Sequence, residues 1–473
     1  MAERSITAEE QQRCADAIQR ARSAMNAAEG YDQARVDRLI RAIAWAGGNL
    51  STATRLAAMS VAESGLGSPE PSRRSKVLGI LRDALRQKSM GVIEEIPEKA
   101  IVKYAKPAGV IAALIPVTSP YVTPIGIAIY AIKCKDAVIF APHPASQKTT
   151  AETVRLMRAA LQQLGAPVDL LQCIERPSIP LSQALMAGCD LTIATGGPPM
   201  VRAAYGSGKP AYGVGAGNAT MVIDDTADVA EAARNTAISK TNDHGSGCSA
   251  DGNLVVDASI YDALLAKLQD EGGYVVNDAE KARLREAYWD ADGRRTPDTI
   301  ARPAHVVAAK AGIALPPGKT FLIVPETNIG KEHLFSTEKL GIVLAIFKCR
   351  GFDEALAMVT RIFETGGRGH SCGIYSFNDE HIHRLALVAP VSRIMVRQIQ
   401  SRANAGTFTN GMPMTSSMGC GVWGGNITNE NISLKHYMNV TWVSRETPED
   451  RPSEQELFGE FYDSATFDAG PAS

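Results

Sequence analysis

The pattern of apolar and polar positions changes once along the chain, close to residue 100. Residues 7–89 repeat apolar positions at helical spacing, which predicts a layer of helices. Beyond residue 100, short apolar runs alternate with amphipathic stretches, and this predicts a parallel sheet with helical crossovers. The expected strands are 110–115, 137–140, 169–174, 191–194 and 220–223, with helices at 121–133, 147–164, 181–187 and 201–205. The pattern is typical of a doubly wound, Rossmann-like α/β unit.

A second α/β unit follows the first. Its expected strands are 253–256, 321–324, 341–347, 371–375 and 393–396, again separated by helical stretches. We therefore divide the chain into residues 1–226, with the N-terminal helices and a cofactor-binding domain, residues 227–418, with a second domain, and residues 419–473. We expect the last segment to return to the first domain or to a neighbouring subunit, and to end in a loose acidic tail.

Composition and charge restrict the kind of partner. A net charge of −2 over 473 residues gives neither nucleic acid nor an anionic membrane an electrostatic reason to bind. No apolar stretch is long enough to span a membrane, and the polar N-terminus is unlike a secretory signal. The cysteines form no CxxC pair and the histidines no paired-ligand spacing, so we expect a reduced, cytoplasmic compartment and no metal site.

One cysteine has the surroundings of a nucleophile. Cys248 lies within SKTNDHGSGCSADGNLVVD, residues 239–257, among glycines and serines and directly before an expected strand. Small neighbours leave the sulfur open to a ligand, and a thiolate is strongly nucleophilic. The alternative is a loop cysteine without a role, because most free cysteines pack as small apolar side chains.

Three glycine-rich segments are further candidates for a ligand site. Residues 191–205, LTIATGGPPMVRAAY, predict a strand, a tight turn at Gly196 and Gly197, and a helix whose start favours a phosphate; an ordinary strand-to-helix turn is the alternative. His370, in GGRGHS, either points into a cleft or is a solvated loop histidine. Residues 419–426, GCGVWGGN, form either a wall of a substrate cleft or a packed surface loop.

Together these segments resemble the CoA-acylating branch of the aldehyde dehydrogenase superfamily over nearly the whole chain. The matching pieces are KPAGVIAALIPVTSP (106–120), APHP (141–144), residues 193–220, the Cys248 segment, GGRGHS (366–371) and GCGVWGGNITNEN (419–431). Within the branch, the chain most resembles acylating sulfoacetaldehyde and succinate-semialdehyde dehydrogenases. The resemblance implies an aldehyde-dehydrogenase-like α/β fold, with a Rossmann-like cofactor domain and an α/β catalytic domain, in a homodimer or homotetramer.

The resemblance also implies roles for particular residues. Cys248 would be the nucleophile, Thr195 to Gly197 would meet the phosphates of the cofactor, and Glu338 would hold the ribose on the nicotinamide side. Ser119 stands where the family usually has an asparagine that helps to bind the oxyanion. The donor would then be the Ser119 hydroxyl or the backbone amide of Cys248.

The acyl acceptor follows from a missing base. Hydrolytic relatives release the acyl group from the cysteine with water and a glutamate, but the corresponding residue in GVGAGN is Gly213, which cannot accept a proton. This favours coenzyme A as the acceptor and a small aldehyde as the substrate. A hydrolytic aldehyde dehydrogenase is one alternative, and a non-catalytic assembly protein that kept the fold is another.

The dinucleotide and the aldehyde depend on two more places. After strand 137–140, residues 141–144 lack the carboxylate that commonly binds the adenosine ribose and repels a 2′-phosphate. His143 or Lys148 could accommodate that phosphate, so we expect His143 to contact the cofactor and favour NADP over NAD. Arg397 follows strand 393–396, where most relatives carry asparagine, and a guanidinium suits an anion. We therefore assign Arg397 and His370 to the substrate and favour sulfoacetaldehyde, oxidised to sulfoacetyl-CoA. Succinate semialdehyde and acetaldehyde are alternative substrates, and bracing the strand through a carboxylate is an alternative role for Arg397.

Overall fold

Four helices begin the chain. The computed structural model describes residues 4–462. The helices are α1 (Ala8–Ala27), α2 (Gln33–Gly48), α3 (Leu50–Ser64) and α4 (Arg74–Leu85). Thr7 and Glu10 form a capping box at the start of α1, and the Asp32 side chain accepts from the Arg35 amide at the start of α2. The predicted helical layer is confirmed.

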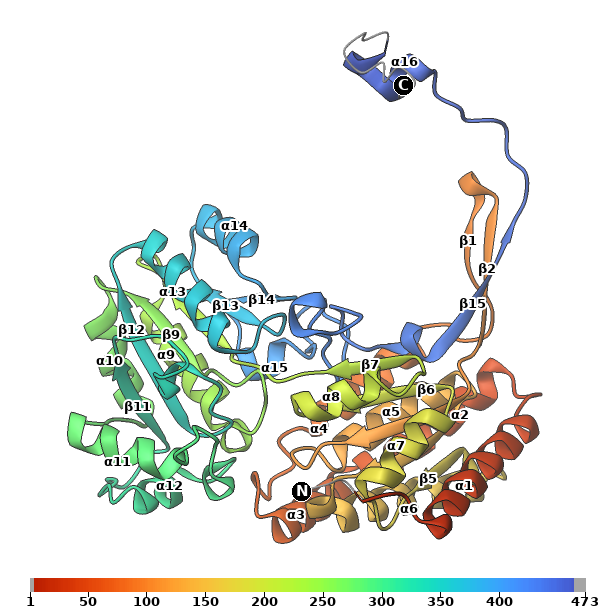
Figure 1. Cartoon of the computed structure of the whole chain (residues 1–473), viewed down its shortest axis with the longest axis horizontal. Coiled ribbons are helices and arrows are strands. Elements are labelled where there is room, and N and C mark those ends of the chain that lie inside the picture. The colour runs from red at the N-terminus through yellow and green to blue at the C-terminus, as the bar shows by residue number, and fades with distance from the viewer. Residues whose placement is uncertain (1–3, 463–473) are drawn as a thin grey trace, which may run out of the picture.

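The first sheet has five parallel strands in the order β5-β4-β3-β6-β7. All residues of β3 and β4 are buried, and helices lie on both faces of the sheet (Figure 1). The strand order reverses between β3 and β6, which is where sheets of this kind bind nucleotides. The strands are β3 (Val110–Ile115), β4 (Ala137–Pro142), β5 (Leu171–Cys173), β6 (Leu191–Thr195) and β7 (Ala211–Val214), connected by α5 (Val122–Lys133), α6 (Gln147–Gln163), α7 (Ile179–Gly188) and α8 (Pro198–Tyr205). The predicted Rossmann-like unit is confirmed.

The second sheet has seven parallel strands in the order β10-β11-β12-β9-β8-β13-β14. Its strands are β8 (Thr220–Ile223), β9 (Asn253–Asp257), β10 (Gly273–Val275), β11 (Phe321–Glu326), β12 (Val343–Cys349), β13 (Cys372–Tyr375) and β14 (Ile394–Val396). Its helices are α9 (Val229–Thr241), α10 (Tyr261–Asp270), α11 (Asp278–Tyr288), α12 (Ala304–Lys310), α13 (Phe352–Thr365), α14 (Asp379–Val388) and α15 (Gln400–Ala403). The α/β fold with two parallel sheets is thus confirmed.

One strand lies in a different sheet from the one expected. The sequence pattern grouped β8 with the first sheet, but β8 pairs with β9 and β13 in the second. A buried run of four residues carries no information about its partner strands, because both sheets offer apolar neighbours.

After β14 the chain returns to the first unit. Met414, Ile432, Leu434 and Tyr437 belong to the hydrophobic core of the five-stranded sheet, although they follow the second sheet in sequence. The Tyr130 hydroxyl on α5 donates to the Met414 carbonyl at 2.7 Å. This return brings residues 406–431 across the junction between the two units, beside the candidate site described below.

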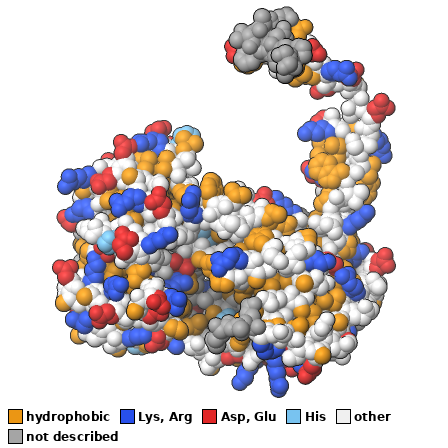
Figure 2. Space-filling view, viewed as in Figure 1, with side chains coloured by type: hydrophobic (Ala, Val, Ile, Leu, Met, Phe, Trp, Pro, Cys, Tyr) orange, Lys and Arg blue, Asp and Glu red, His pale blue; other side chains and the backbone are white. Residues whose placement is uncertain are grey.

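A three-stranded antiparallel arm projects from the body. It consists of β1 (Gly91–Ile96), β2 (Ile101–Pro107) and β15 (Met438–Ser444) in the order β1-β2-β15, and an extended segment leads from β15 to α16 (Glu454–Phe458) (Figure 1). Every residue of 439–462 is exposed, and hydrophobic side chains stand out along the arm in Figure 2. The end of the expected acidic tail, residues 463–473, lies outside the described residues.

Within residues 4–462, no helix combines the length and the apolar character that crossing a bilayer requires.

Candidate active site

The loop that carries Cys248 is tightly folded between the two units. It leaves α9 through a short turn in which Asp243, His244 and Gly245 all have positive φ. On the other side of the thiol, a Cβ at position 217 would lie 2.0 Å from the Cys248 carbonyl oxygen, so only glycine allows this approach. The backbone amide of Cys248 donates to no other group among the described residues, which leaves it free for an oxyanion.

A histidine lies directly against the thiol. The Nε2 atom of His370 is 3.0 Å from the Cys248 Sγ, and its Nδ1 atom is 2.8 Å from the Ser371 hydroxyl. The buried Arg393 donates to the His370 carbonyl at 3.0 Å and fixes the bend that presents the ring. The cleft interpretation of His370 is thus favoured over the solvated-loop alternative, because the side chain is buried. The direct contact with Cys248 was not foreseen from the sequence.

Both partners of this pair are neutral near pH 7. Burial raises the pKa of Cys248 to about 11; the Glu338 carboxylate also raises it, while Lys76 and Arg73 lower it. Burial lowers the pKa of His370 to about 3, with a smaller contribution from Arg393. A neutral imidazole can accept a proton from the thiol as the sulfur attacks, so the pair can act as a nucleophile with its base.

Glu338 lies behind this pair and is already bonded. Its carboxylate accepts from the Gly217 amide at 2.9 Å and pairs with Arg295 at 3.0 Å. Burial raises its pKa, against the opposing effect of Arg295. A ribose in the role expected from the sequence would have to share or replace these bonds.

A cavity of about 750 Å³, which we call the α8 cavity, opens on one side of the Cys248 loop. The cavity is lined by Gly215 and Ala216, which directly precede Gly217 and its contact with Cys248. Two arginines also line it, Arg202 and Arg368, and neither has a carboxylate partner among the described residues. A Cβ at Gly215 or at Gly366 would meet nothing within 4 Å. Open glycines and two unpaired guanidiniums fit the pyrophosphate of a dinucleotide or of coenzyme A.

The turn at Gly196 and Gly197 contributes fewer donors than expected. The first two residues of α8 are Pro198 and Pro199, which lack an N–H, so the Gly197 amide is the donor left at this end of the helix. The Thr195 hydroxyl is 2.8 Å from that of Ser417. A phosphate bound here would depend on Arg202, a residue to which the sequence assigned no role.

The end of β4, where the sequence showed no carboxylate, does receive one from a distant segment. Glu63 on α3 accepts from the amides of Lys148 and Thr149 at 2.7 and 2.8 Å and so caps α6. His143 is exposed, and its Nδ1 accepts from the Ala145 amide at 3.1 Å. Both oxygens of Glu63 therefore accept from the backbone amides of α6.

On the other side of the thiol loop lies a cavity of about 430 Å³, which we call the α4 cavity. Arg73 connects it to the thiol loop: its guanidinium pairs with Asp243 at 2.8 Å, donates to the Ser246 hydroxyl, and donates to the Thr118 carbonyl at 3.1 Å. Ser119, next to Thr118, lies beside Arg73 in a small adjoining hollow. Ser119 is therefore near the thiol loop, and Arg73 holds the two loops together.

Arg397 lines the α4 cavity but is already paired. Its Nε donates to Glu231 at 2.9 Å, and its guanidinium stacks on the Phe377 ring at 3.7 Å. Its backbone has a positive φ of 53°. The pairing with a carboxylate that was considered from the sequence is therefore present.

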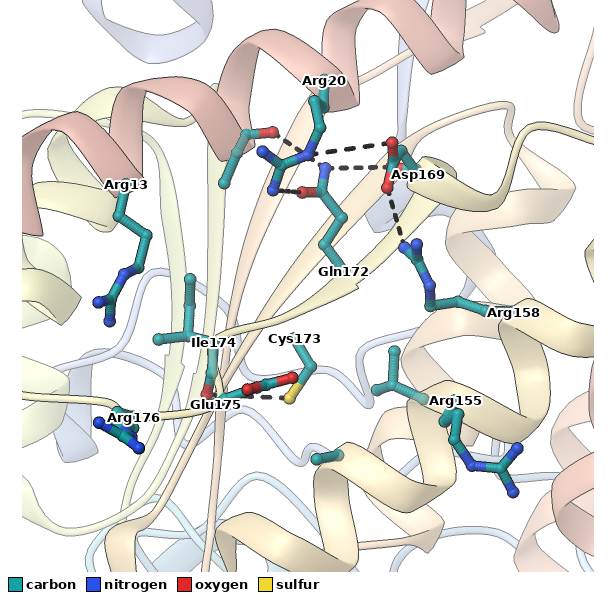
Figure 3. A pocket seen from close by; sticks show the side chains of 13 residues that line it. Arg13, Arg20, Arg155, Arg158, Asp169, Gln172, Cys173, Ile174, Glu175 and Arg176 are labelled. Carbon is teal, nitrogen blue, oxygen red and sulfur yellow. Dashed lines mark hydrogen bonds and ion pairs between the residues drawn. The ribbon is translucent and has the colours of Figure 1, made fainter.

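A third cavity, of about 600 Å³, lies between α1, α6 and the end of β5, and we call it the arginine-lined cavity (Figure 3). Five arginines line it, together with Asp169, Glu175 and Cys173: Arg13, Arg20, Arg155, Arg158 and Arg176. It shares no lining residue with the α4 or α8 cavity.

One group of possible metal ligands occurs among the described residues, formed by Asp224, Asp225 and His381. His381 Nδ1 is 2.7 Å from the Asp224 carboxylate, which also accepts from Ser376, so these groups satisfy one another.

Comparisons with known proteins agree with this geometry. Residues 4–281 match the model of the aldehyde dehydrogenase family. The chain is 44% identical over 451 residues to a sulfoacetaldehyde dehydrogenase of an Acholeplasma species, covering 94% of this chain and 93% of the relative. It is 38% identical over 449 residues to an acylating sulfoacetaldehyde dehydrogenase of Bilophila wadsworthia, covering 93% and 97%.

A solved structure gives the same result. The crystal structure of an acetylating aldehyde dehydrogenase from Geobacillus thermoglucosidasius superposes with a TM-score of 0.89 at 33% identity, covering 94% of this chain and 99% of that one. The resemblance inferred from the sequence is confirmed, and the chain belongs to the aldehyde dehydrogenase family.

Proposed function

We propose that this chain is a CoA-acylating aldehyde dehydrogenase that oxidises a small anionic aldehyde, with sulfoacetaldehyde as the preferred substrate. The observation that carries the proposal is the contact of 3.0 Å between the Cys248 sulfur and His370, between two cavities. The names of the two relatives support both the acylating reaction and the aldehyde.

Cys248 and His370 would share the first step. The sulfur attacks the aldehyde carbon, and His370 Nε2 accepts the thiol proton. The developing oxyanion is within the reach of the free Cys248 amide, with the Ser119 hydroxyl as a second candidate donor. A nicotinamide dinucleotide, when bound in the α8 cavity, supplies the acceptor for the hydride that leaves the substrate carbon. The acyl group is then left on Cys248 as a thioester.

The second step favours a thiol over water. A side chain at position 213 would begin 2.9 Å from Val201 and Tyr205, so the fold offers no space there for a glutamate base. Glu338, the carboxylate that affects the pKa of Cys248, is bonded to Arg295 and Gly217. Once His370 has released the first proton to solvent, it can accept the proton of the coenzyme A thiol. The sulfur of coenzyme A then attacks the thioester carbon, the bond between the acyl group and Cys248 breaks, and the Cys248 thiolate takes the proton back from His370. A hydrolytic enzyme would have to activate water, a weaker nucleophile than a thiolate, without a glutamate at position 213.

NADP is the proposed dinucleotide, with NAD as the alternative. The support is the end of β4, where His143 is exposed and Glu63, a carboxylate from α3, caps α6. Both oxygens of Glu63 already accept from the amides of α6, so this carboxylate is not available to bind the ribose hydroxyls of NAD. Comparing kcat/KM for NADP and NAD checks this assignment; a preference for NAD would overturn it.

The substrate assignment is tested by a panel of aldehydes with coenzyme A. We expect the highest kcat/KM for sulfoacetaldehyde, a lower value for succinate semialdehyde, and the lowest for acetaldehyde, read from the absorbance of the reduced cofactor. Acetaldehyde as the best substrate would contradict the anionic assignment.

We also propose that the arm and the tail join copies of this chain into a dimer or tetramer. The supporting observation is that Trp442, Val443, Leu457 and Phe458 are exposed on segments that leave the body of the chain. Deleting residues 451–473 should lower the mass measured by light scattering or reduce solubility. Unchanged mass and solubility would show that the tail has no such role.

A further inference from the structure

Lys76 is a cation without a partner beside the active site. It lies in the first turn of α4, is half-buried, and lines the α4 cavity. Its ammonium makes no hydrogen bond and no ion pair with any other residue of 4–462. A half-buried lysine that lacks an anion is unfavourable unless a ligand provides one.

The other cations of the same cavity are either paired or exposed to solvent. Arg73 is paired with Asp243 at 2.8 Å, and Arg397 with Glu231 at 2.9 Å. Arg402 is exposed to solvent. No Asp or Glu is found among the residues that line the cavity within the described part of the chain. The uncompensated charge inside the cavity therefore belongs to Lys76.

Lys76 is also close enough to the nucleophile to interact with it electrostatically. The charges of Lys76 and Cys248 each shift the pKa of the other. Burial and, to a smaller extent, Arg73 lower the pKa of Lys76 to about 8, against the opposing effects of Cys248 and Asp243. At pH 7, Lys76 is therefore protonated in most molecules. A small molecule that reacts at Cys248 is close enough to interact with this positive charge.

We propose that Lys76 binds the acid group of the aldehyde, a sulfonate or a carboxylate, and sets the preference of Cys248 for anionic substrates. This inference rests on the proposed function, since it assigns a residue to the anionic end of the same substrate. The aldehyde carbon would lie at Cys248 and the anion at the wall of the α4 cavity formed by Lys76. Arg73 and Arg397 would then position the neighbouring loops through Asp243 and Glu231.

The first test uses alkylation of Cys248 and needs neither cofactor nor aldehyde. Iodoacetate and iodoacetamide react with the same thiolate, but only iodoacetate is an anion. The alkylation rate with iodoacetate divided by the rate with iodoacetamide therefore reports the charge near Cys248. In Lys76→Met, which has a similar length and no charge, we expect this ratio to fall by about tenfold. Lys76→Arg should restore most of it. Labelling is followed at Cys248 by peptide mass spectrometry.

The matched control is Lys88→Met, which removes a lysine from the exposed segment just beyond α4. We expect the ratio in this variant to stay within twofold of the original chain. An unchanged ratio in Lys76→Met, or an equal fall in Lys88→Met, would overturn the proposal. An equal fall in both alkylation rates would also overturn it, because Lys76 would then act on the thiol alone.

The second test uses turnover. Lys76→Met should raise KM for sulfoacetaldehyde by about tenfold or more while KM for acetaldehyde stays within twofold. In the original chain, KM for sulfoacetaldehyde should rise above about pH 8, where Lys76 loses its proton. The charged groups that surround Lys76 and must be considered in this profile are Arg73, Asp243, Cys248, Arg397 and Arg402.

The proposed function and the role of Lys76 can be disproved independently of each other. If the original chain did not form acyl-CoA, the proposed function would fall, while the alkylation ratio would still report whether Lys76 attracts an anion to Cys248. If acyl-CoA formed but both Lys76 tests showed no selectivity, the role of Lys76 would fall alone.

Discussion

The arginine-lined cavity and the Cys248 site each combine a cysteine with several cations. They differ in the groups that contact the cysteine and in the carboxylates that neutralise the cations. In the arginine-lined cavity, Arg158 is paired with Asp169 at 3.0 Å, and Glu175 lies beside Cys173 (Figure 3). Among the described residues no base contacts Cys173, whose sulfur lies 3.9 Å from the Ile174 carbonyl oxygen. Burial and, to a smaller extent, Glu175 raise the pKa of this thiol to about 12.

At Cys248 the same residue types are arranged differently. The thiol has His370 at 3.0 Å, and the cavity beside it has an unpaired lysine and no lining carboxylate among the described residues. A high count of arginines and a large volume therefore do not identify the reactive site. What distinguishes it is a base in contact with the sulfur and a cation that is unpaired although half-buried, whereas the unpaired Arg176 of the arginine-lined cavity is exposed.

The largest expected difference is between the two cysteines. Cys248→Ala should abolish aldehyde-dependent reduction of the cofactor, because no other described thiol contacts a histidine. Cys173→Ala should retain nearly full activity. Both variants should keep the circular dichroism spectrum of the original chain. Turnover of even a few per cent in Cys248→Ala would move the nucleophile elsewhere.

Removing the base should have the next largest effect. His370→Ala leaves Cys248 without a proton acceptor, and we expect kcat to fall by about a hundredfold or more. Because burial holds the pKa of Cys248 near 11, the residual rate should increase as the pH rises and the thiolate fraction grows. His370→Asn keeps a polar side chain without the base and serves as the control. A pH profile equal to that of the original chain would contradict the role of His370.

Arg397→Asn should have a modest, selective effect. Glu231 already neutralises part of the positive charge of Arg397. We therefore expect KM for sulfoacetaldehyde to rise about threefold, an effect of the size that exposed ion pairs contribute. Asparagine is chosen because it tolerates the positive φ of this position. Equal changes for acetaldehyde and sulfoacetaldehyde would show that Arg397 only supports the strand.

The smallest effect is expected in the arginine-lined cavity. Arg176 is exposed and has no partner among the described residues, so Arg176→Gln removes a charge at little structural cost. KM for sulfoacetaldehyde should stay within about twofold, because the cavity shares no lining residue with the site at Cys248. A clear rise in KM for coenzyme A, but not for the aldehyde, would instead give this cavity a part in binding the second substrate.

The sequence predicted those features that depend on local patterns. The two sheets follow from apolar runs between helices, and the small residues around Cys248 mark the loop that carries the thiol. Glycine-rich segments singled out His370, which lies against the Cys248 sulfur, and residues that line the α8 cavity. In each case the signal lies within a few neighbouring residues.

The features that the sequence did not predict depend on contacts between distant segments of the chain. Lys76 lies in an ordinary amphipathic helix, and nothing in its neighbourhood of sequence places it near residue 248. The pairing of Arg397 with Glu231 and the capping of α6 by Glu63 join residues far apart in the chain. Arg202 and Arg368 stand within segments already singled out, so their charge was a usable signal that the glycines beside them obscured.

The central claim is that coenzyme A, and not water, removes the acyl group from Cys248. The direct measurement is the time course of cofactor reduction with sulfoacetaldehyde, with and without coenzyme A, together with mass spectrometry of the products. We predict continuous turnover to sulfoacetyl-CoA with coenzyme A, and without it a burst of at most one reduced cofactor per site, followed by a slow phase. Fast, steady formation of free sulfoacetate without coenzyme A would contradict the account.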